Sequence, residues 1–250
     1  MSSSSIINAK DVTKSKKSEK EEIDIKSHKD IEGFSQWIEE DDARYLAMVE
    51  VYNNKTKSGD LILNGKWEIV KVMNDTNTGF SGKLYNEVGT SNYVFATAGT
   101  QVLSGKDWIA NIEQQFGIDT VQYNQALSIA NNLSKEYRNS NLIFVGHSLG
   151  GGLASTMSRS TGLDAITFNS SALSHTLYKG VENGSKIAAY ITDGDILDYV
   201  NENLLNQKVE GQIIRRISPT SKIPNLQGIP KTGAYQALRG ILIHCDPNIL

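Results

Sequence analysis

The order of hydrophobic and polar positions separates a polar beginning from a longer region with regular apolar spacing. Residues 1–30 are rich in Lys, Glu, Asp and Ser and contain few apolar residues. Such a composition buries too little apolar surface to offset the entropy lost on ordering. We therefore expect a flexible polar arm over residues 1–30 and a single folded domain over residues 31–250.

The first part of this domain is predicted to contain helices followed by short strands. Apolar residues recur at mostly helical spacing between Ile31 and Tyr52, which predicts one or two helices. Three short segments then alternate or cluster apolar residues between turn residues: Trp67–Met73, Gly79–Tyr85 and Tyr93–Thr97. This arrangement is typical of an antiparallel β meander.

The remaining pattern alternates helices with single apolar strands. A short helix is predicted over Asp107–Gln115 and a longer one over Asp119–Tyr137, where apolar residues approximate i, i+3, i+4 spacing. Strands are predicted at Leu142–Val145, Asp164–Phe168 and Lys186–Ile191. Helices between parallel strands form right-handed crossovers, so the fold class is α/β, with a mostly parallel central sheet and helices on both faces.

Composition and charge narrow the function classes. The net charge is −3, so nothing in the charge balance suggests a nucleic-acid partner, which would normally require a clustered basic surface. Cys245 is the only cysteine, so no internal disulfide can form. No apolar stretch approaches the roughly 18 residues of a membrane span. The first residues, Met1–Lys10, lack the basic and apolar regions of a Sec signal peptide, so we expect a cytoplasmic protein or one secreted by another route.

The segment from Leu142 to Ala154 contains the pattern that points to a catalytic residue. Four apolar residues lead to Gly146, Ser148 follows between glycines, and apolar residues at helical spacing begin after it. This strand, turn and helix pattern is that of a nucleophile elbow, in which Gly146 and Gly150 remove side chains that would collide. It predicts that Ser148 is a catalytic nucleophile.

A serine nucleophile needs a histidine to take its proton and an acid to orient that histidine. The expected chain order is Ser, then Asp or Glu, then His. Of the four histidines, His28 and His147 precede Ser148, and His175 leaves no room for an acid-bearing strand. His244 is therefore the predicted base.

The acid is expected in the loop after the strand Lys186–Ile191. Three aspartates compete there, and Asp195 is the first choice because Gly194 allows a turn before it and the apolar residues after it can anchor the loop. Asp193 is the alternative. Each could instead serve as the N-cap of a helix that begins near Ile196.

Two backbone N–H groups are needed to stabilise the oxyanion. The residue after the nucleophile, Leu149, supplies one, and a loop after an earlier strand supplies the other. Gly99 and Thr100 follow the strand Tyr93–Thr97 and fit this second role. The Thr100 hydroxyl could add a further donor or hold its own loop.

Three segments resemble the class 3 lipases, a branch of the α/β-hydrolase fold that includes fungal lipases and bacterial phospholipases A1. They are Val94–Thr100 with Asp107–Asn111, then Gly146–Gly151, and finally Thr167–Asn169. Ala98 stands where the family usually has arginine. The resemblance spans Trp67 to His244 and implies the following site: Ser148, Asp195 and His244 as the triad, Thr100 and Leu149 as the oxyanion hole, and a lid from Gln101 to about Glu113.

The resemblance also implies a function. We expect a serine carboxylic-ester hydrolase that acts on lipids or other acyl esters at a membrane or micelle surface, as a lipase or phospholipase A1, with no cofactor and no metal. The alternatives are a small-ester esterase or thioesterase, and a catalytically silent binding module of the same fold. If the protein is an exported bacterial effector, an immunity or chaperone protein is an expected partner.

Overall fold

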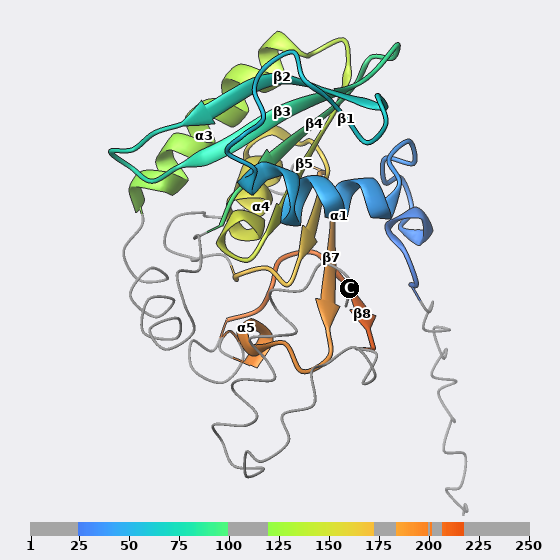
Figure 1. The fold of residues 1–250 in the computed structure, drawn as a ribbon. Helices are drawn as coiled ribbons and strands as arrows, with labels where there is room; N and C mark the ends of the chain where they lie inside the picture. The colour runs from blue at the N-terminus through green and yellow to red at the C-terminus, as the bar shows by residue number, and fades with distance from the viewer. Residues whose placement is uncertain (1–24, 100–119, 173–183, 200, 202–206, 218–250) are drawn as a thin grey trace, which may run out of the picture.

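The computed structural model describes residues 25–99, 120–172, 184–199, 201 and 207–217 (Figure 1). Within them the chain forms one eight-stranded sheet with helices packed against it. The elements are η1 (His28–Asp30), α1 (Glu40–Met48), η2 (Glu50–Tyr52), β1 (Leu61–Ile62), β2 (Trp67–Asn74), β3 (Ser81–Glu87), β4 (Asn92–Thr97), α3 (Thr120–Glu136), β5 (Asn141–His147), α4 (Leu149–Thr161), β6 (Ala165–Phe168), β7 (Ile187–Thr192), α5 (Ile196–Tyr199) and β8 (Gln212–Arg216).

The order of the strands in the sheet follows their order in the chain, β1 to β8. Strands β1 to β4 pair antiparallel, and β4 to β8 pair parallel. The predicted meander is thus confirmed as β2, β3 and β4, and so is the mostly parallel core. Because parallel strands all run one way, the carboxyl ends of β4, β5, β6 and β7 share one edge of the sheet.

Helices cover both faces of the sheet, as predicted. The strand order advances in one direction, so right-handed crossovers place α3 and α4 on the same face. Helix α1 lies across the opposite face (Figure 1). Alternate residues of a strand therefore enter different cores: Ile143 and Val145 pack on the α1 side, whereas Leu142 and Phe144 pack on the α3 and α4 side. This double burial explains the continuous apolar run in β5.

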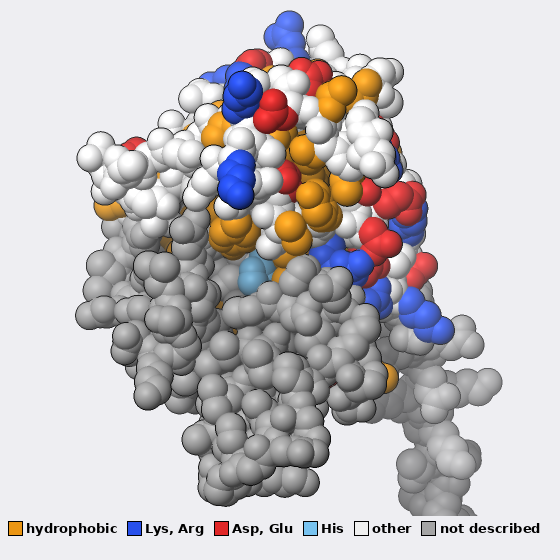
Figure 2. Space-filling model, viewed as in Figure 1, with side chains coloured by type: hydrophobic (Ala, Val, Ile, Leu, Met, Phe, Trp, Pro, Cys, Tyr) orange, Lys and Arg blue, Asp and Glu red, His pale blue; other side chains and the backbone are white. Residues whose placement is uncertain are grey.

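Several apolar side chains of the α1 side stay half-buried. They pack against the core and reach the surface: Trp37, Tyr45, Met48, Tyr52, Ile62, Leu63 and Val72. Figure 2 shows hydrophobic side chains gathered on the described part of one face, with charged side chains above and beside them. No helix in the described part of the chain is long and apolar enough to cross a membrane.

Strand β8 was not predicted from the hydrophobic pattern. In this strand only Ile214 is buried, while Gln212, Ile213 and Arg215 are exposed. It pairs with β7 alone among the described strands, so its apolar signal is weak. The predicted helix Asp107–Gln115 lies outside the described residues.

The packed part of the chain begins before residue 31. His28 is buried, with 1% of its surface exposed, although residues 1–30 were expected to form a flexible arm. Its Nε2 lies 3.0 Å from the carbonyl oxygen of Ile38, and its Nδ1 lies 2.9 Å from Tyr190 Oη. A carbonyl only accepts, so Nε2 carries the proton and Nδ1 accepts from the tyrosine hydroxyl. Residues 25–30 therefore belong with the fold.

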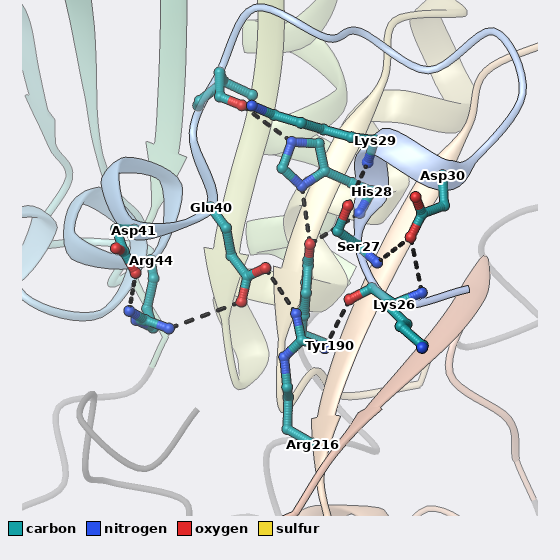
Figure 3. A network of polar contacts seen from close by, with 11 residues as sticks. Lys26, Ser27, His28, Lys29, Asp30, Glu40, Asp41, Arg44, Tyr190 and Arg216 are labelled. Carbon is teal, nitrogen blue, oxygen red and sulfur yellow. Dashed lines mark hydrogen bonds and ion pairs between the residues drawn. The ribbon is translucent and has the colours of Figure 1, made fainter. Parts of the chain in front are cut away.

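Charged groups complete this attachment (Figure 3). The Arg216 guanidinium of β8 donates to Glu40 of α1 at 2.7 Å and to the carbonyl oxygen of Lys26 at 2.7 Å. The same guanidinium lies over the ring of Tyr190, 4.9 Å from its centroid. The N-terminal segment is thereby tied to α1, β7 and β8 together.

This attachment predicts a pH dependence of stability. Burial lowers the pKa of His28 below its ordinary value of 6.5, against opposing effects of the Ile38 carbonyl and Glu40. The unfolded chain then binds a proton near pH 6.5 that the folded chain resists, so the His28 contribution is complete above pH 6.5 and declines as the pH falls. Urea unfolding between pH 7.5 and 5 should show wild type losing its advantage over His28→Gln. A difference in unfolding free energy that stays constant with pH would contradict this.

Candidate active site

Ser148 lies at a sharp turn between β5 and α4. Its backbone angles are φ 58° and ψ −130°, a conformation that L-residues rarely adopt. Such a residue costs about 1–3 kcal/mol and persists only where the surroundings enforce it. The side chain is half-buried, and its hydroxyl does not cap α4. The predicted strand, turn and helix around Ser148 are confirmed.

Glycines around Ser148 allow backbones to approach where no side chain would fit. A Cβ on Gly146 would lie 2.2 Å from the carbonyl oxygen of Gly150, and one on Gly150 would lie 2.2 Å from that of Thr97. On Gly152, a Cβ would lie 2.3 Å from Ser171 Oγ and 2.7 Å from Tyr123 Oη. All these distances are shorter than real Cβ contacts. Gly146 and Gly150 are steric requirements of the turn because they face backbone atoms, whereas a side chain at Gly152 would have to displace the side chains of Ser171 and Tyr123.

The backbone of Ser148 is fixed from the β6 side. Its N–H donates to the carbonyl oxygen of Phe168 at 3.2 Å, and its carbonyl oxygen accepts from the N–H of Ser171 at 3.0 Å. Helix α4 begins at Leu149, so the Leu149 N–H belongs to the first turn, where N–H groups lack acceptors within the helix. The positive end of the helix dipole adds to the attraction for a negative oxygen there.

The loop after β4 meets this turn, as the predicted oxyanion hole requires. Thr97 Oγ1 donates to the carbonyl oxygen of Gly150 at 2.7 Å. A Cβ on Gly99 would lie 2.9 Å from the carbonyl oxygen of His147 and 3.2 Å from the N of Gly150. Gly99 is thus packed against the turn that carries Ser148. Thr100, the predicted oxyanion-hole residue, lies outside the described residues.

Tyr52 is a neighbour of the site that the sequence did not reveal. Its hydroxyl oxygen accepts a hydrogen bond from the N–H of Gly99 at 2.8 Å. The segment that carries Tyr52 is held by a buried lysine. Lys83 Nζ donates to the carbonyl oxygens of Glu50 and Asn53, each at 2.8 Å, and lies 3.3 Å from Glu50 Oε1. These contacts link β3 to the loop that follows β4.

The two candidate acids differ in their surroundings. Asp195 is buried, with 2% of its surface exposed, and Oδ1 accepts from the N–H of Leu197 at 2.8 Å and of Asp198 at 3.2 Å. It therefore caps α5, the structural role considered from the sequence. Asp193 is exposed, and its carboxylate lies 3.8 Å from Arg215 Nη1. Only Asp195 combines burial with a fixed orientation.

These groups gather at the carboxyl ends of the parallel strands, the edge at which open α/β sheets bind ligands. Ser148 follows β5, Gly99 follows β4 and Asp195 follows β7. His244 and the expected lid from Gln101 to Glu113 lie outside the described residues. The described part of the chain contains no group of three His, Cys, Asp or Glu side chains that could hold a metal ion.

Comparison with known proteins agrees with this geometry. Residues 55–242, most of the chain, match the Tle-like phospholipase domain. The chain belongs to this family. A relative of known name is the extracellular phospholipase A1 of Serratia liquefaciens, which is 40% identical over 102 residues. That alignment covers 41% of the present chain and 30% of the Serratia protein.

Solved structures are also similar to this chain. MDLA of Penicillium cyclopium, in a mutant form, superposes with a TM-score of 0.53 at 16% identity, covering 71% of this chain and 78% of that one. A triacylglycerol lipase from Penicillium expansum gives a TM-score of 0.48 at 15% identity over 71% of this chain and 77% of that one. The superposition on MDLA, together with the mostly parallel sheet, shows the predicted α/β-hydrolase fold.

The close contacts of Gly150 predict how an added methyl group at this position changes the stability of the protein. Gly150→Ala should lower the free energy of unfolding by about 1–3 kcal/mol, because the added carbon meets the backbone of Thr97 to Gly99 and cannot be relieved by side-chain rotation. At an exposed helix position a change to alanine is favourable through helix propensity, so Asn132→Ala in α3 is the control for the effect of alanine itself. Urea unfolding of both variants tests this. Equal stability of Gly150→Ala and wild type would show that the turn has room for a side chain.

Proposed function

We propose that this protein is a serine carboxylic-ester hydrolase that acts on lipids, as a lipase or phospholipase A1. The observation that carries the proposal is the strained backbone of Ser148 at the start of α4. Strain of this kind is retained where it exposes a reacting group. Membership of the Tle-like phospholipase family supports the lipid substrate.

In the proposed reaction, Ser148 Oγ attacks the acyl carbonyl while His244 takes its proton. The Leu149 and Thr100 N–H groups stabilise the tetrahedral oxyanion, which collapses and expels the alcohol as His244 returns the proton to it. Water then attacks the acyl-enzyme with His244 again as base. Hydrolysis releases the fatty acid and restores Ser148, so no cofactor or metal enters the balance.

We assign the acid of the triad to Asp195 in preference to Asp193. A triad acid has to be held in one orientation to fix the tautomer of the histidine. Two backbone N–H groups hold the Asp195 carboxylate through Oδ1, and burial limits competition from water. Asp193 lies exposed beside Arg215. The capping of α5 and the proposed catalytic role are compatible, since capping supplies the orientation.

The substrate is proposed to be a phospholipid or another acyl ester at a membrane or micelle surface. The Serratia relative is named an extracellular phospholipase A1, which supports this class and action outside the producing cell. Half-buried apolar side chains on the α1 side, among them Tyr52, whose hydroxyl contacts Gly99, supply surface of the kind that acyl chains contact. A protein exported as an effector would need an immunity or chaperone partner in the producer.

Replacement of the nucleophile is the first test. Ser148→Ala should keep the fold and lose about 10⁴-fold or more of kcat, because the acyl-enzyme cannot form. The measurement is fatty-acid release from phosphatidylcholine and phosphatidylglycerol vesicles, followed by mass spectrometry, together with hydrolysis of a short-chain p-nitrophenyl ester. Unchanged hydrolysis by Ser148→Ala would overturn the proposal. Hydrolysis of the short ester alone would favour an esterase, and no turnover by wild type would favour a binding module.

The two aspartates provide a matched pair of isosteric variants. Asp195→Asn should lower kcat by about 10⁴-fold, because an amide no longer stabilises the imidazolium or selects its tautomer. Asp193→Asn should change kcat by less than about threefold, because an exposed ion pair is worth little. Steady-state kinetics on the p-nitrophenyl ester measures both. The reverse ranking would move the acid to Asp193.

A further inference from the structure

Asn169 lies between the predicted nucleophile and the predicted acid. It follows β6 directly, at the sheet edge where β5 ends in Ser148 and β7 leads to Asp195. Its side chain is buried, with 2% of its surface exposed. No role in the proposed reaction has been given to this residue.

Hydrogen bonds connect Asn169 to both neighbours. The Ser148 N–H donates to the carbonyl of Phe168, the peptide group that Asn169 completes, at 3.2 Å. On the other side, Asn169 Oδ1 accepts from the N–H of Thr192 at 2.8 Å, and the carbonyl of Thr192 accepts from the N–H of Asp195 at 3.0 Å. Asn169 thus contacts the turn of the predicted nucleophile through its peptide group and the turn to the predicted acid through its side-chain amide.

The local conformation of Asn169 is unfavourable for stability. Its φ is 40°, in the left-handed region that glycine occupies at lower cost. Its Nδ2 is buried and has no hydrogen-bond acceptor among the described residues. An unsatisfied buried donor is destabilising, whereas glycine would bring neither penalty. What asparagine adds, relative to glycine, is the Oδ1 contact with the N–H of Thr192.

We propose that Asn169 is a positioning residue that sets the place of Asp195 relative to Ser148. Its Oδ1 holds the Thr192 peptide, from which the turn to Asp195 starts, against the end of β6. The Asp195 carboxylate is then kept where it can orient the base. This inference rests on the proposed function and adds a residue that acts through the acid without touching the substrate.

The test is a double-mutant cycle between Asn169→Gly and Asp195→Asn. Asn169→Gly keeps the left-handed backbone and removes only the side chain. On a p-nitrophenyl ester below its micelle concentration, it should lower kcat about tenfold, the effect of a small misplacement, with KM changed less than about twofold. In the Asp195→Asn background the same change should lower kcat by less than about twofold, because the acid that it positions is already absent.

Asn201 provides a matched control. It is also a buried asparagine of this region, but its amide contacts the N–H of Ala172 and the carbonyl of Ser170. Asn201→Ala should lower stability, and its effect on kcat should be the same with Asp195 or Asn at position 195. Urea unfolding of every variant at the assay temperature confirms that each is folded.

Two outcomes would overturn the inference. Equal losses of kcat for Asn169→Gly in both backgrounds would show a general structural role, and an unchanged kcat in the wild-type background would show none. Ser148→Ala, assayed alongside, separates these results from failure of the proposed function. If Ser148→Ala retains hydrolysis, the reaction does not use this site, whereas if it loses hydrolysis, the cycle judges Asn169 alone.

Discussion

The close approach of backbones around Ser148 is the constraint on which the rest of the site depends. The turn after β5 leaves no space for a Cβ at Gly146 or Gly150, since each would lie 2.2 Å from a backbone carbonyl oxygen. With these glycines α4 can begin at Leu149, directly after Ser148 with its positive φ of 58°. The strain at Ser148 is therefore maintained by packing from β4 and from the segment after β6.

Contacts from strands β3 to β7 hold the site in place. On the β4 side, the buried Lys83 holds the segment of Tyr52, whose hydroxyl fixes Gly99. On the β6 side, backbone N–H groups and Asn169 connect Ser148 to the turn before Asp195. Side chains on loops can be positioned only as precisely as the strands that carry those loops. This explains why polar groups that support the loops, such as Lys83 and Asn169, are buried there.

The sequence pattern predicted the features that depend on interactions between residues close together in the chain. The elbow around Ser148, the meander and the alternation of helices and strands were all readable, because apolar periodicity and glycine spacing reflect short-range sterics. Strand β8 was not, because an edge strand with exposed arginine has little apolar signal. The roles of His28 and Tyr52 depend on partners far along the chain, and no sequence window contains both members of such a pair. The sequence already favoured Asp195 over Asp193, and the burial of Asp195 supports that proposed assignment.

The contact between His28 and Tyr190 also bears on when the fold can be completed during synthesis. The two residues are 162 positions apart, so their contact cannot form until β7 has been made. At about 5–20 residues per second, a ribosome needs roughly 8–32 s to cover that distance. Since Asp195 is made just after Tyr190, this contact and the turn after β7 become available at the same stage of synthesis. The Arg216 contacts with Lys26 and Glu40 form later still, so the N-terminal segment is fully attached only after β8 has been made.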